Sequence, residues 1–277
     1  MDSAINNIIV QASEKASELH SGNLTYVDGR GLRRCRICGG KLETILSVPH
    51  LPKLDGKKVN CICRCDKVQA EKIRAELKEI EIESTKVYIR AACFKSAEMR
   101  KNTFDNDDSS KSKMSELCRR WVNNYAMHLQ KGDPIKWLFI HGDFGTGKTF
   151  YAACIANAMI DMGYRVRMVT GADIEAEIFG AEDKAELYAK FVGYDILILD
   201  DFATERKSDY MYEILYNVIN DRYNARKAMI ITSNMTTAET VDPKDERVRR
   251  IMSRLWEVSY PIELIGEDRR KAKGAWK

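Results

Sequence analysis

Residues 142–149, with the sequence GDFGTGKT, constrain this chain more than any other segment. They match the pattern G-x-x-x-x-G-K-[ST] at every fixed position. Glycines in this pattern let the loop turn so that its amide N–H groups converge on phosphate oxygens, and the following helix offers its positive N-terminal end. An apolar run precedes the segment and a helical pattern follows it, as a strand–loop–helix phosphate site requires. We therefore expect the chain to bind ATP and magnesium.

Each position of this segment has an expected role in holding the nucleotide. The loop amides would contact the phosphates, Lys148 would reach the outer phosphates, and the hydroxyl of Thr149 would hold magnesium. The expected nucleotide-binding residues are Gly142, Asp143, Phe144, Gly145, Thr146, Gly147, Lys148 and Thr149.

Two further apolar runs end in the polar side chains that phosphoryl transfer needs. The run ILIL ends in Asp200 and Asp201, as a Walker B motif requires. We expect Asp200 to contact the water shell of magnesium and Asp201 to polarise the attacking water, and the alternative is a solvated strand end. Asn234 follows the run AMIITS and could position that water beside the γ-phosphate.

Short apolar runs alternate with helical patterns through residues 113–234, which is typical of a parallel sheet covered by helices on both faces. Because parallel strands share one carboxyl edge, the three polar strand ends should meet there. The predicted fold class is α/β. The expected elements are strands in WLFIHG, YRVRMVT, DILILDD and AMIITSN, and helices in SELCRRWVNNYAMHLQ, after Lys148, around 172–190 and at 208–224.

Five of the eight cysteines lie between Cys35 and Cys65, and in a reducing cytosol such clustering indicates a metal rather than disulfides. Cys35 and Cys38 belong to a C-x-x-C-G-G segment, the form of a zinc knuckle. The second group offers three thiols for two places. We favour Cys63 and Cys65, with Cys61 as a substitute ligand, in a closed structural Cys₄ zinc site. Unliganded cysteines are the alternative.

The composition of the sequence changes near residue 100. Residues 66–83 place apolar side chains on one helical stripe, which suits a helix that leaves a small metal domain or one that packs on the core. The polar stretch KNTFDNDDSSKSK at 101–113 is typical of a linker or surface loop. We therefore expect a helical and zinc-binding domain at 1–100 and a larger domain at 101–277.

Composition limits the surroundings and the partners of the chain. The formal charge of +4 is compatible with transient nucleic-acid contact, but it excludes a dedicated DNA-coating protein. Hydrophobic residues make up 44% of the chain, and no apolar run approaches the ~20 residues that cross a bilayer. The N-terminus shows no secretory signal pattern. We expect a cytoplasmic protein with no membrane contact.

The segment ILILDDFATERKSDYMYEILYNVINDRYNARKAMIITSNMT resembles the core of bacterial and phage-encoded DnaC/DnaI-type replicative helicase loaders, which are AAA+ ATPases. The resemblance extends over residues 100–270, and the Cys-rich N-terminal region is similar to the zinc domain of DnaI-like members. It implies a RecA-like AAA+ αβα core preceded by a small Cys₄ zinc-binding domain. By position, it assigns Lys148 and Thr149 to Walker A, Asp200 and Asp201 to Walker B, and Asn234 to sensor 1.

The resemblance also gives roles to arginines near the C-terminus that otherwise suggest only a charged surface. Arg254 matches an arginine finger, which acts on a neighbouring subunit, and Arg250 is an alternative. Arg270 matches sensor 2, in a register that is fixed only to within one residue.

The resemblance implies a function in replication initiation. Such a loader uses ATP to place a DnaB-type helicase hexamer on single-stranded DNA, and it self-associates into a ring or spiral. Here the Walker B motif ends in Asp-Asp rather than the usual Asp-Glu, and the shorter second side chain predicts slow ATP hydrolysis. Arg206, Lys207 and Tyr210 are candidates for DNA contacts, or they form an ordinary charged helix face. An IstB-type transposition helper ATPase is the close alternative.

Overall fold

A computed structural model describes residues 25–45, 47, 56, 58–60, 63–108, 112–203 and 209–269. The chain divides into two units, Met1–Glu83 and Ser84–Lys277. The division lies inside helix α2 (Arg64–Cys93), which continues well beyond the helix expected at 66–83, whereas the change in composition suggests a boundary near residue 100. Among the described residues, no helix combines the length and apolar character that a membrane span needs.

Two short antiparallel hairpins lie in the described part of the smaller unit. Their strands are β1 (Thr25–Val27), β2 (Arg33–Cys35), β3 (Glu43–Ile45) and β4 (Lys58–Asn60). β1 pairs with β2, and β3 pairs with β4. The carboxylate of Glu43 lies 2.6 Å from Nε of Arg33 and 2.7 Å from Nζ of Lys58, so it links β2 to the second hairpin.

The larger unit is built on a sheet of five parallel strands in the order β6-β7-β8-β5-β9. The strands are β5 (Trp137–Gly142), β6 (Val166–Thr170), β7 (Ile196–Phe202), β8 (Ala228–Ser233) and β9 (Ser259–Leu264). β7, β8 and β5 are consecutive in this order, so the strand ends with the expected site residues are neighbours.

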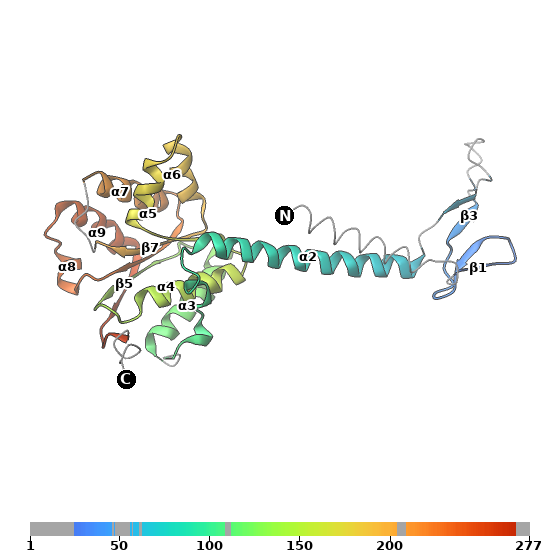
Figure 1. Cartoon of the computed structure of the whole chain (residues 1–277), viewed down its shortest axis with the longest axis horizontal. Helices are drawn as coiled ribbons and strands as arrows, with labels where there is room; N and C mark the ends of the chain where they lie inside the picture. Colours follow the sequence, from blue (N-terminus) through green and yellow to red (C-terminus); the bar gives the residue numbers. More distant parts are fainter. Residues whose placement is uncertain are drawn as a thin grey trace. The chain divides into compact units, whose positions relative to one another are not determined.

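Helices cover both faces of this sheet, with α3 and α4 on one side and α5, α7 and α9 on the other (Figure 1). The helices are α3 (Lys113–Lys131), α4 (Lys148–Asp161), α5 (Gly171–Phe179), α6 (Lys184–Gly193), α7 (Asp209–Asn224), α8 (Thr237–Val241) and α9 (Glu246–Val258). The predicted α/β fold with a parallel sheet between helical layers is therefore confirmed.

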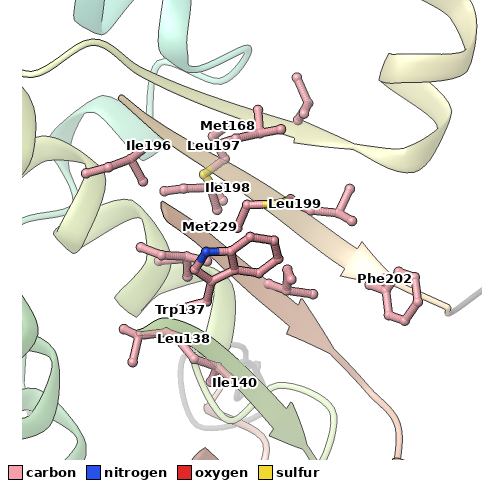
Figure 2. Close-up of a cluster of buried hydrophobic side chains, with 14 of the residues drawn as sticks. Trp137, Leu138, Ile140, Met168, Ile196, Leu197, Ile198, Leu199, Phe202 and Met229 are labelled. Atoms are coloured by element: carbon pink, nitrogen blue, oxygen red, sulfur yellow. The ribbon is translucent and has the colours of Figure 1, made fainter. Parts of the chain in front are cut away.

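Apolar side chains of the central strands fill the space between sheet and helices (Figure 2). Ile140 of β5, Ile198 and Leu199 of β7, and Met229 of β8 are fully buried. Because these strands have helices on both faces, both sets of side chains must be apolar, which explains their continuous apolar runs. Burying each such side chain stabilises the folded state by roughly 1.5–3 kcal/mol relative to leaving it exposed. This core fixes where the strand ends lie.

Three features of the larger unit differ from the sequence-based expectation. The helix expected around 172–190 is two helices, because Asp183 caps a new helix by accepting a hydrogen bond from the backbone of Glu186 at 3.0 Å. β9 was not expected. The stretch at 101–113 is more than a linker, since Phe104 is buried in the core. The short 3₁₀ helices in and beside this stretch are Met99–Lys101 and Phe104–Asn106.

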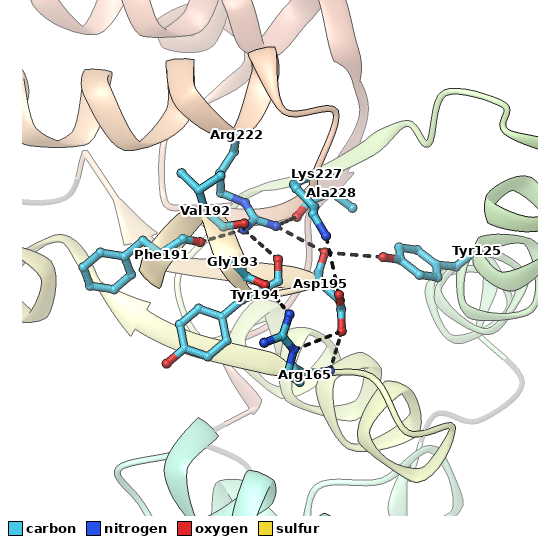
Figure 3. A network of polar contacts seen from close by, with 10 residues as sticks. All are labelled: Tyr125, Arg165, Phe191, Val192, Gly193, Tyr194, Asp195, Arg222, Lys227 and Ala228. Atoms are coloured by element: carbon cyan, nitrogen blue, oxygen red, sulfur yellow. Dashed lines mark hydrogen bonds and ion pairs between the residues drawn. The ribbon is translucent and has the colours of Figure 1, made fainter. Parts of the chain in front are cut away.

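A buried arginine joins the start of β7 to the start of β8 (Figure 3). Arg222, near the end of α7, is fully buried and donates hydrogen bonds only to backbone carbonyl groups among its described partners. These carbonyls belong to Phe191, Val192, Tyr194, Asp195 and Ala228. Carbonyl groups at the end of a helix lack hydrogen-bond donors within the helix. The guanidinium of Arg222 supplies donors to the carbonyl groups at the end of α6. Burial lowers the pKa of Arg222 to about 9, which leaves it charged at neutral pH.

Candidate functional site

A cleft of about 240 Å³ opens at the carboxyl edge of the sheet. The residues that line it are Asn106, Asp108, Gly145, Gly147, Lys148, Thr149, Phe150, Asp201, Asn234 and Arg269. The structure thus brings together side chains from the β5–α4 loop and from the ends of β7 and β8, as the shared strand edge predicts. Asn106, Asp108 and Phe150 are additional lining residues that the sequence patterns did not indicate, and Arg269 is adjacent to the arginine expected as sensor 2.

Two glycines of the β5–α4 loop have backbone conformations that other residues rarely adopt. The φ angle is +125° at Gly142 and +104° at Gly147. A Cβ atom on Gly142 would collide with the backbone carbonyl of Leu264 in β9. Gly147 lines the cleft and precedes the first residue of α4, so the positive end of this helix lies at the cleft. The loop has the form of an anion-binding site.

The ammonium group of Lys148 lies folded against this loop. Its Nζ donates hydrogen bonds to the carbonyl oxygens of Gly142 at 3.0 Å and of Asp143 at 2.5 Å, and the side chain is almost fully buried. The hydroxyl of Thr146 also donates to the carbonyl of Asp143, at 2.9 Å. A positive charge is therefore held against the loop at the cleft, which suits a polyphosphate.

The α4 helix and the β7 strand meet through a hydroxyl and a carboxylate. Oγ1 of Thr149 donates to Oδ1 of Asp200 at 3.0 Å. Burial raises the pKa of Asp200, and the neighbouring carboxylate of Asp201 raises it further. Hard oxygen ligands of this kind suit Mg²⁺, and a cation here would offset the buried negative charge. Thr149 and Asp200 therefore fit the expected magnesium contact.

Asp201 is aimed into the cleft by an irregularity in β7. The pairing of β7 with β8 shifts register between Leu199 and Phe202, and Asp201 has a φ of +56°. Bulges of this kind redirect a side chain near active sites. Nδ2 of Asn234 donates to Oδ1 of Asp201 at 3.3 Å, so the two residues expected to handle the attacking water are in contact.

The expected arginine finger lies outside the cleft of its own chain. Nη2 of Arg254 donates to the hydroxyl of Tyr216 at 3.0 Å, and its guanidinium lies 5.3 Å from the centre of the Tyr223 ring. The alternative, Arg250, lies over the Tyr216 ring at 5.0 Å. Both arginines are on α9 and stack on α7, and neither lines the cleft.

Arg269, one residue before the arginine expected as sensor 2, lines the cleft. Its backbone N donates to the carbonyl of Gly145 at 3.0 Å, and its guanidinium lies 5.7 Å from the centre of the Phe150 ring. Arg270 lies outside the described residues, as do Cys61, Arg206 and Lys207. Two adjacent arginines in GEDRR were the available signal, but sequence spacing could not fix the register.

The smaller unit brings four thiols together. The Sγ atoms of Cys35, Cys38, Cys63 and Cys65 all lie within 4.8 Å of one another. A tetrahedral zinc site with Zn–S bonds of ~2.3 Å requires sulfurs about 3.8 Å apart, so the donor set fits Zn²⁺. The backbone amides of Cys65 and Gly40 hold the pKa of Cys38 down to about 6, which favours the thiolate that a metal needs. A Cβ on Gly40 would lie 3.0 Å from Sγ of Cys38 and 3.1 Å from Cβ of Cys63, so the space beneath the cluster favours glycine.

Comparison with solved structures shows the fold. The crystal structure of DnaI has a TM-score of 0.55 and 22% identity, and it covers 66% of this chain and 99% of that chain. The crystal structure of the DnaC helicase loader has a TM-score of 0.53 and 22% identity, and it covers 61% of this chain and 100% of that chain. This chain therefore shares the fold of these two structures, which is the αβα fold that the resemblance to DnaC/DnaI-type proteins implies.

Comparison with known sequences identifies the family. The replicative helicase loader DnaI of Bacillus subtilis is 26% identical over 179 residues, which are 60% of this chain and 56% of DnaI. An insertion-sequence ATP-binding protein of Sinorhizobium fredii is 32% identical over 105 residues, 37% of this chain and 35% of that protein. The chain thus spans little more than half of the first relative and about a third of the second. The profile of the IstB-like ATP-binding proteins matches residues 74–273, most of the chain, which therefore belongs to this family.

Proposed function

We propose that this chain is an ATP-hydrolysing helicase loader that binds a DnaB-type replicative helicase hexamer and places it on single-stranded DNA. The observation that supports a loader most directly is the cluster of four thiols that precedes the nucleotide unit. The similarity to the replicative helicase loader of Bacillus subtilis agrees with this proposal. The larger unit would supply the ATP-dependent step, and the smaller unit would contact the helicase.

The residues of the cleft suggest how ATP would be hydrolysed. Amides of the β5–α4 loop and Lys148 would bind the phosphates, and Thr149 with Asp200 would hold Mg²⁺, which neutralises phosphate charge when bound. Asp201 would orient and polarise the attacking water, aided by Asn234. The carboxylate of an aspartate reaches less far than that of a glutamate, so we expect slow turnover.

Stabilisation of the transition state would require a neighbouring copy. Arg254 of one subunit would act on the ATP of the next subunit, with Arg250 as the alternative, because neither arginine lines the cleft of its own chain. Arg270 remains a candidate for sensor 2 beside Arg269. ATP binding would therefore promote self-association into a ring or spiral, and both α7 and α9 would lie at the contact between subunits.

The remaining partners are zinc and DNA. We assign structural Zn²⁺ to Cys35, Cys38, Cys63 and Cys65, which leaves no open coordination position for catalysis.

Tyr210 is partly exposed at the start of α7, and its hydroxyl lies 3.2 Å from Nζ of Lys184. An aromatic ring beside a cation suits a base and a phosphate of single-stranded DNA.

Light scattering coupled to gel filtration tests the loader proposal. The full chain is mixed with a DnaB-type helicase and ATP, alongside the Lys148→Ala variant and a Cys35→Ser/Cys38→Ser variant. A complex with the wild-type chain that is lost in the cysteine variant would support both the loader function and the role of the smaller unit. Absence of a complex with the wild-type chain under all nucleotide conditions would refute the proposal.

An IstB-type transposition helper is the second candidate function. It is favoured by the family profile and by the insertion-sequence relative at 32% identity. Its partner would be a transposase on double-stranded DNA. ATP-dependent binding to duplex DNA with no preference for single strands, together with no helicase complex, would favour this candidate.

A further inference from the structure

The guanidinium of Arg269 is contacted on two sides by different parts of the nucleotide unit. Its Nη2 forms an ion pair with Asp108 and lies 3.7 Å from Oδ1 of Asp107. Its Nη1 lies on the loop side, 2.9 Å from the point where a Cβ on Gly147 would be. A guanidinium presents its donors on separate edges, so it can hold a carboxylate with one edge and a phosphate with another.

The acidic side of this arrangement is built into the core. The side chain of Asp107 is fully buried, although a buried carboxylate is costly unless a cation or hydrogen bonds offset it. It lies near Tyr151 of α4, whose hydroxyl is 3.1 Å from Oγ of Ser112. Burial raises the pKa of Tyr151 to about 12, so this phenol is neutral and Arg269 supplies the compensating charge.

The backbone that carries the two aspartates is anchored to the helices of the core. Nη2 of Arg119 in α3 donates to the carbonyl of Phe104 at 2.8 Å. Nδ2 of Asn157 in α4 donates to the carbonyl of Asn102 at 2.8 Å. Phe104 is itself buried. Because residues 102–104 are fixed in this way, Asp107 and Asp108 have a defined position relative to α4, whose first turn forms the phosphate site.

We propose that Asp107 and Asp108 are positioning residues for Arg269, holding its Nη2 edge so that its Nη1 edge faces the phosphates of bound ATP. The inference rests on the proposed ATP-binding function. Gly147 directly precedes Lys148, which in this motif reaches the β- and γ-phosphates. The contribution of Arg269 should therefore be larger for ATP than for ADP, and the aspartates should act through Arg269.

Competition binding with a fluorescent nucleotide measures the dissociation constants for ATP and ADP in the presence of Mg²⁺. We expect Arg269→Ala to reduce the preference for ATP over ADP by about tenfold, and Asp108→Asn to reduce it by about threefold. In the Arg269→Ala background, Asp108→Asn should have no further effect, because the aspartate acts through the arginine. Asp108→Glu should retain most of the preference.

Two further variants separate positioning from structural damage. Asp105→Asn is the matched control, because Asp105 lies on the same segment with 93% of its side chain exposed and should leave the preference unchanged. Because Asp107 is buried, the ATP and ADP affinities of Asp107→Asn are measured at a temperature below the melting transition of that variant. Three results would each overturn the proposal. Asp108→Asn could weaken the binding of ATP and of ADP equally, or it could bind ATP more tightly than wild type. Asp108→Asn could also reduce the preference for ATP as much in the Arg269→Ala background as in the wild-type chain.

The outcome also separates this proposal from the proposed function. A wild-type chain that binds no ATP, or whose ATP binding is unaffected by Lys148→Ala, would refute the ATPase function itself. ATP binding that depends on Lys148 but is the same in wild type and Asp108→Asn would refute only the positioning role.

Discussion

The hydroxyl of Thr232 lies 2.5 Å from Oδ1 of Asp200, to which it donates a hydrogen bond. The hydroxyl oxygen of Thr232 also accepts a hydrogen bond from the backbone N–H of Asp201 at 3.0 Å. One buried side chain of β8 therefore holds both acidic residues at the end of β7. This contact joins the expected magnesium ligand to the residue expected to polarise water, although Thr232 itself is not part of any motif.

Replacing Thr232 with valine keeps the shape of the side chain and removes the hydroxyl. We expect the free energy of unfolding to fall by roughly 1–3 kcal/mol, because the buried carboxylate of Asp200 loses a donor. ATP hydrolysis should fall as well. Urea denaturation and a steady-state ATPase assay measure the two effects. Thr240→Val is the control, since this buried hydroxyl donates to the carbonyl of Thr237, away from the cleft.

Asp200→Asn should stabilise the chain without nucleotide at neutral pH while weakening binding of Mg²⁺-ATP. Burial raises the folded pKa of Asp200 above its ordinary value, so its stabilising contribution is present below the unfolded pKa and lost as pH rises through the folded pKa. The variant does not titrate at this position. Its melting temperature relative to wild type should therefore increase as pH rises from about 4 to about 8. A difference that shrinks with rising pH would contradict this account.

Asp201→Asn should abolish ATP hydrolysis and leave ATP affinity nearly unchanged. The amide cannot polarise water, whereas the Lys148 ammonium and the loop remain intact. Single-turnover hydrolysis and equilibrium ATP binding separate the two quantities. Lys148→Ala is the comparison, since it should lose both. Hydrolysis by Asp201→Asn at the wild-type rate would assign the catalytic role to another group.

Motifs on continuous apolar strands were predictable, and contacts from outside them were not. The run ILIL followed by Asp200 and the loop before Lys148 carry fixed spacings, and the parallel sheet brings them together. Thr232 is one of several polar residues at the end of β8, and only the folded structure shows that its hydroxyl contacts Asp200. Arg269 is separated from Asn234, the preceding strand-end motif, by α8, α9 and β9, so its place in the cleft required the structure.

The missed elements share weak local signals. β9 contains Pro261, and only Ser259 and Ile262 of its residues are buried, because it lies at the edge of the sheet beside β5. The polar stretch at 101–113 resembles a linker, although its single aromatic residue, Phe104, anchors it in the core. The division of the helix expected at 172–190 had a usable signal in the capping residue Asp183. From the sequence alone, a single aromatic residue in a polar stretch does not indicate which part of the core it packs against.

Zinc should be bound at one ion per chain and should depend on four particular cysteines. Cys38→Ser should lose the metal, whereas Cys61→Ser should retain it if Cys63 and Cys65 complete the site. Metal analysis of the purified chain measures both. A chelator should lower the stability of the smaller unit, because such small units have little apolar core, and leave ATP binding unchanged. Retention of zinc by Cys38→Ser together with its loss from Cys61→Ser would reverse the ligand assignment.

Arg222→Met should destabilise the larger unit more than any surface substitution. The guanidinium is fully buried and supplies donors to five backbone carbonyls, as Figure 3 shows, and methionine offers none. We expect a loss of about 3–5 kcal/mol in the free energy of unfolding. Arg165→Met is the control within the same network, because Arg165 is largely exposed and should change stability by less than about 1 kcal/mol. Urea denaturation measures both, and equal effects would show that burial of the guanidinium is not what gives Arg222 its importance.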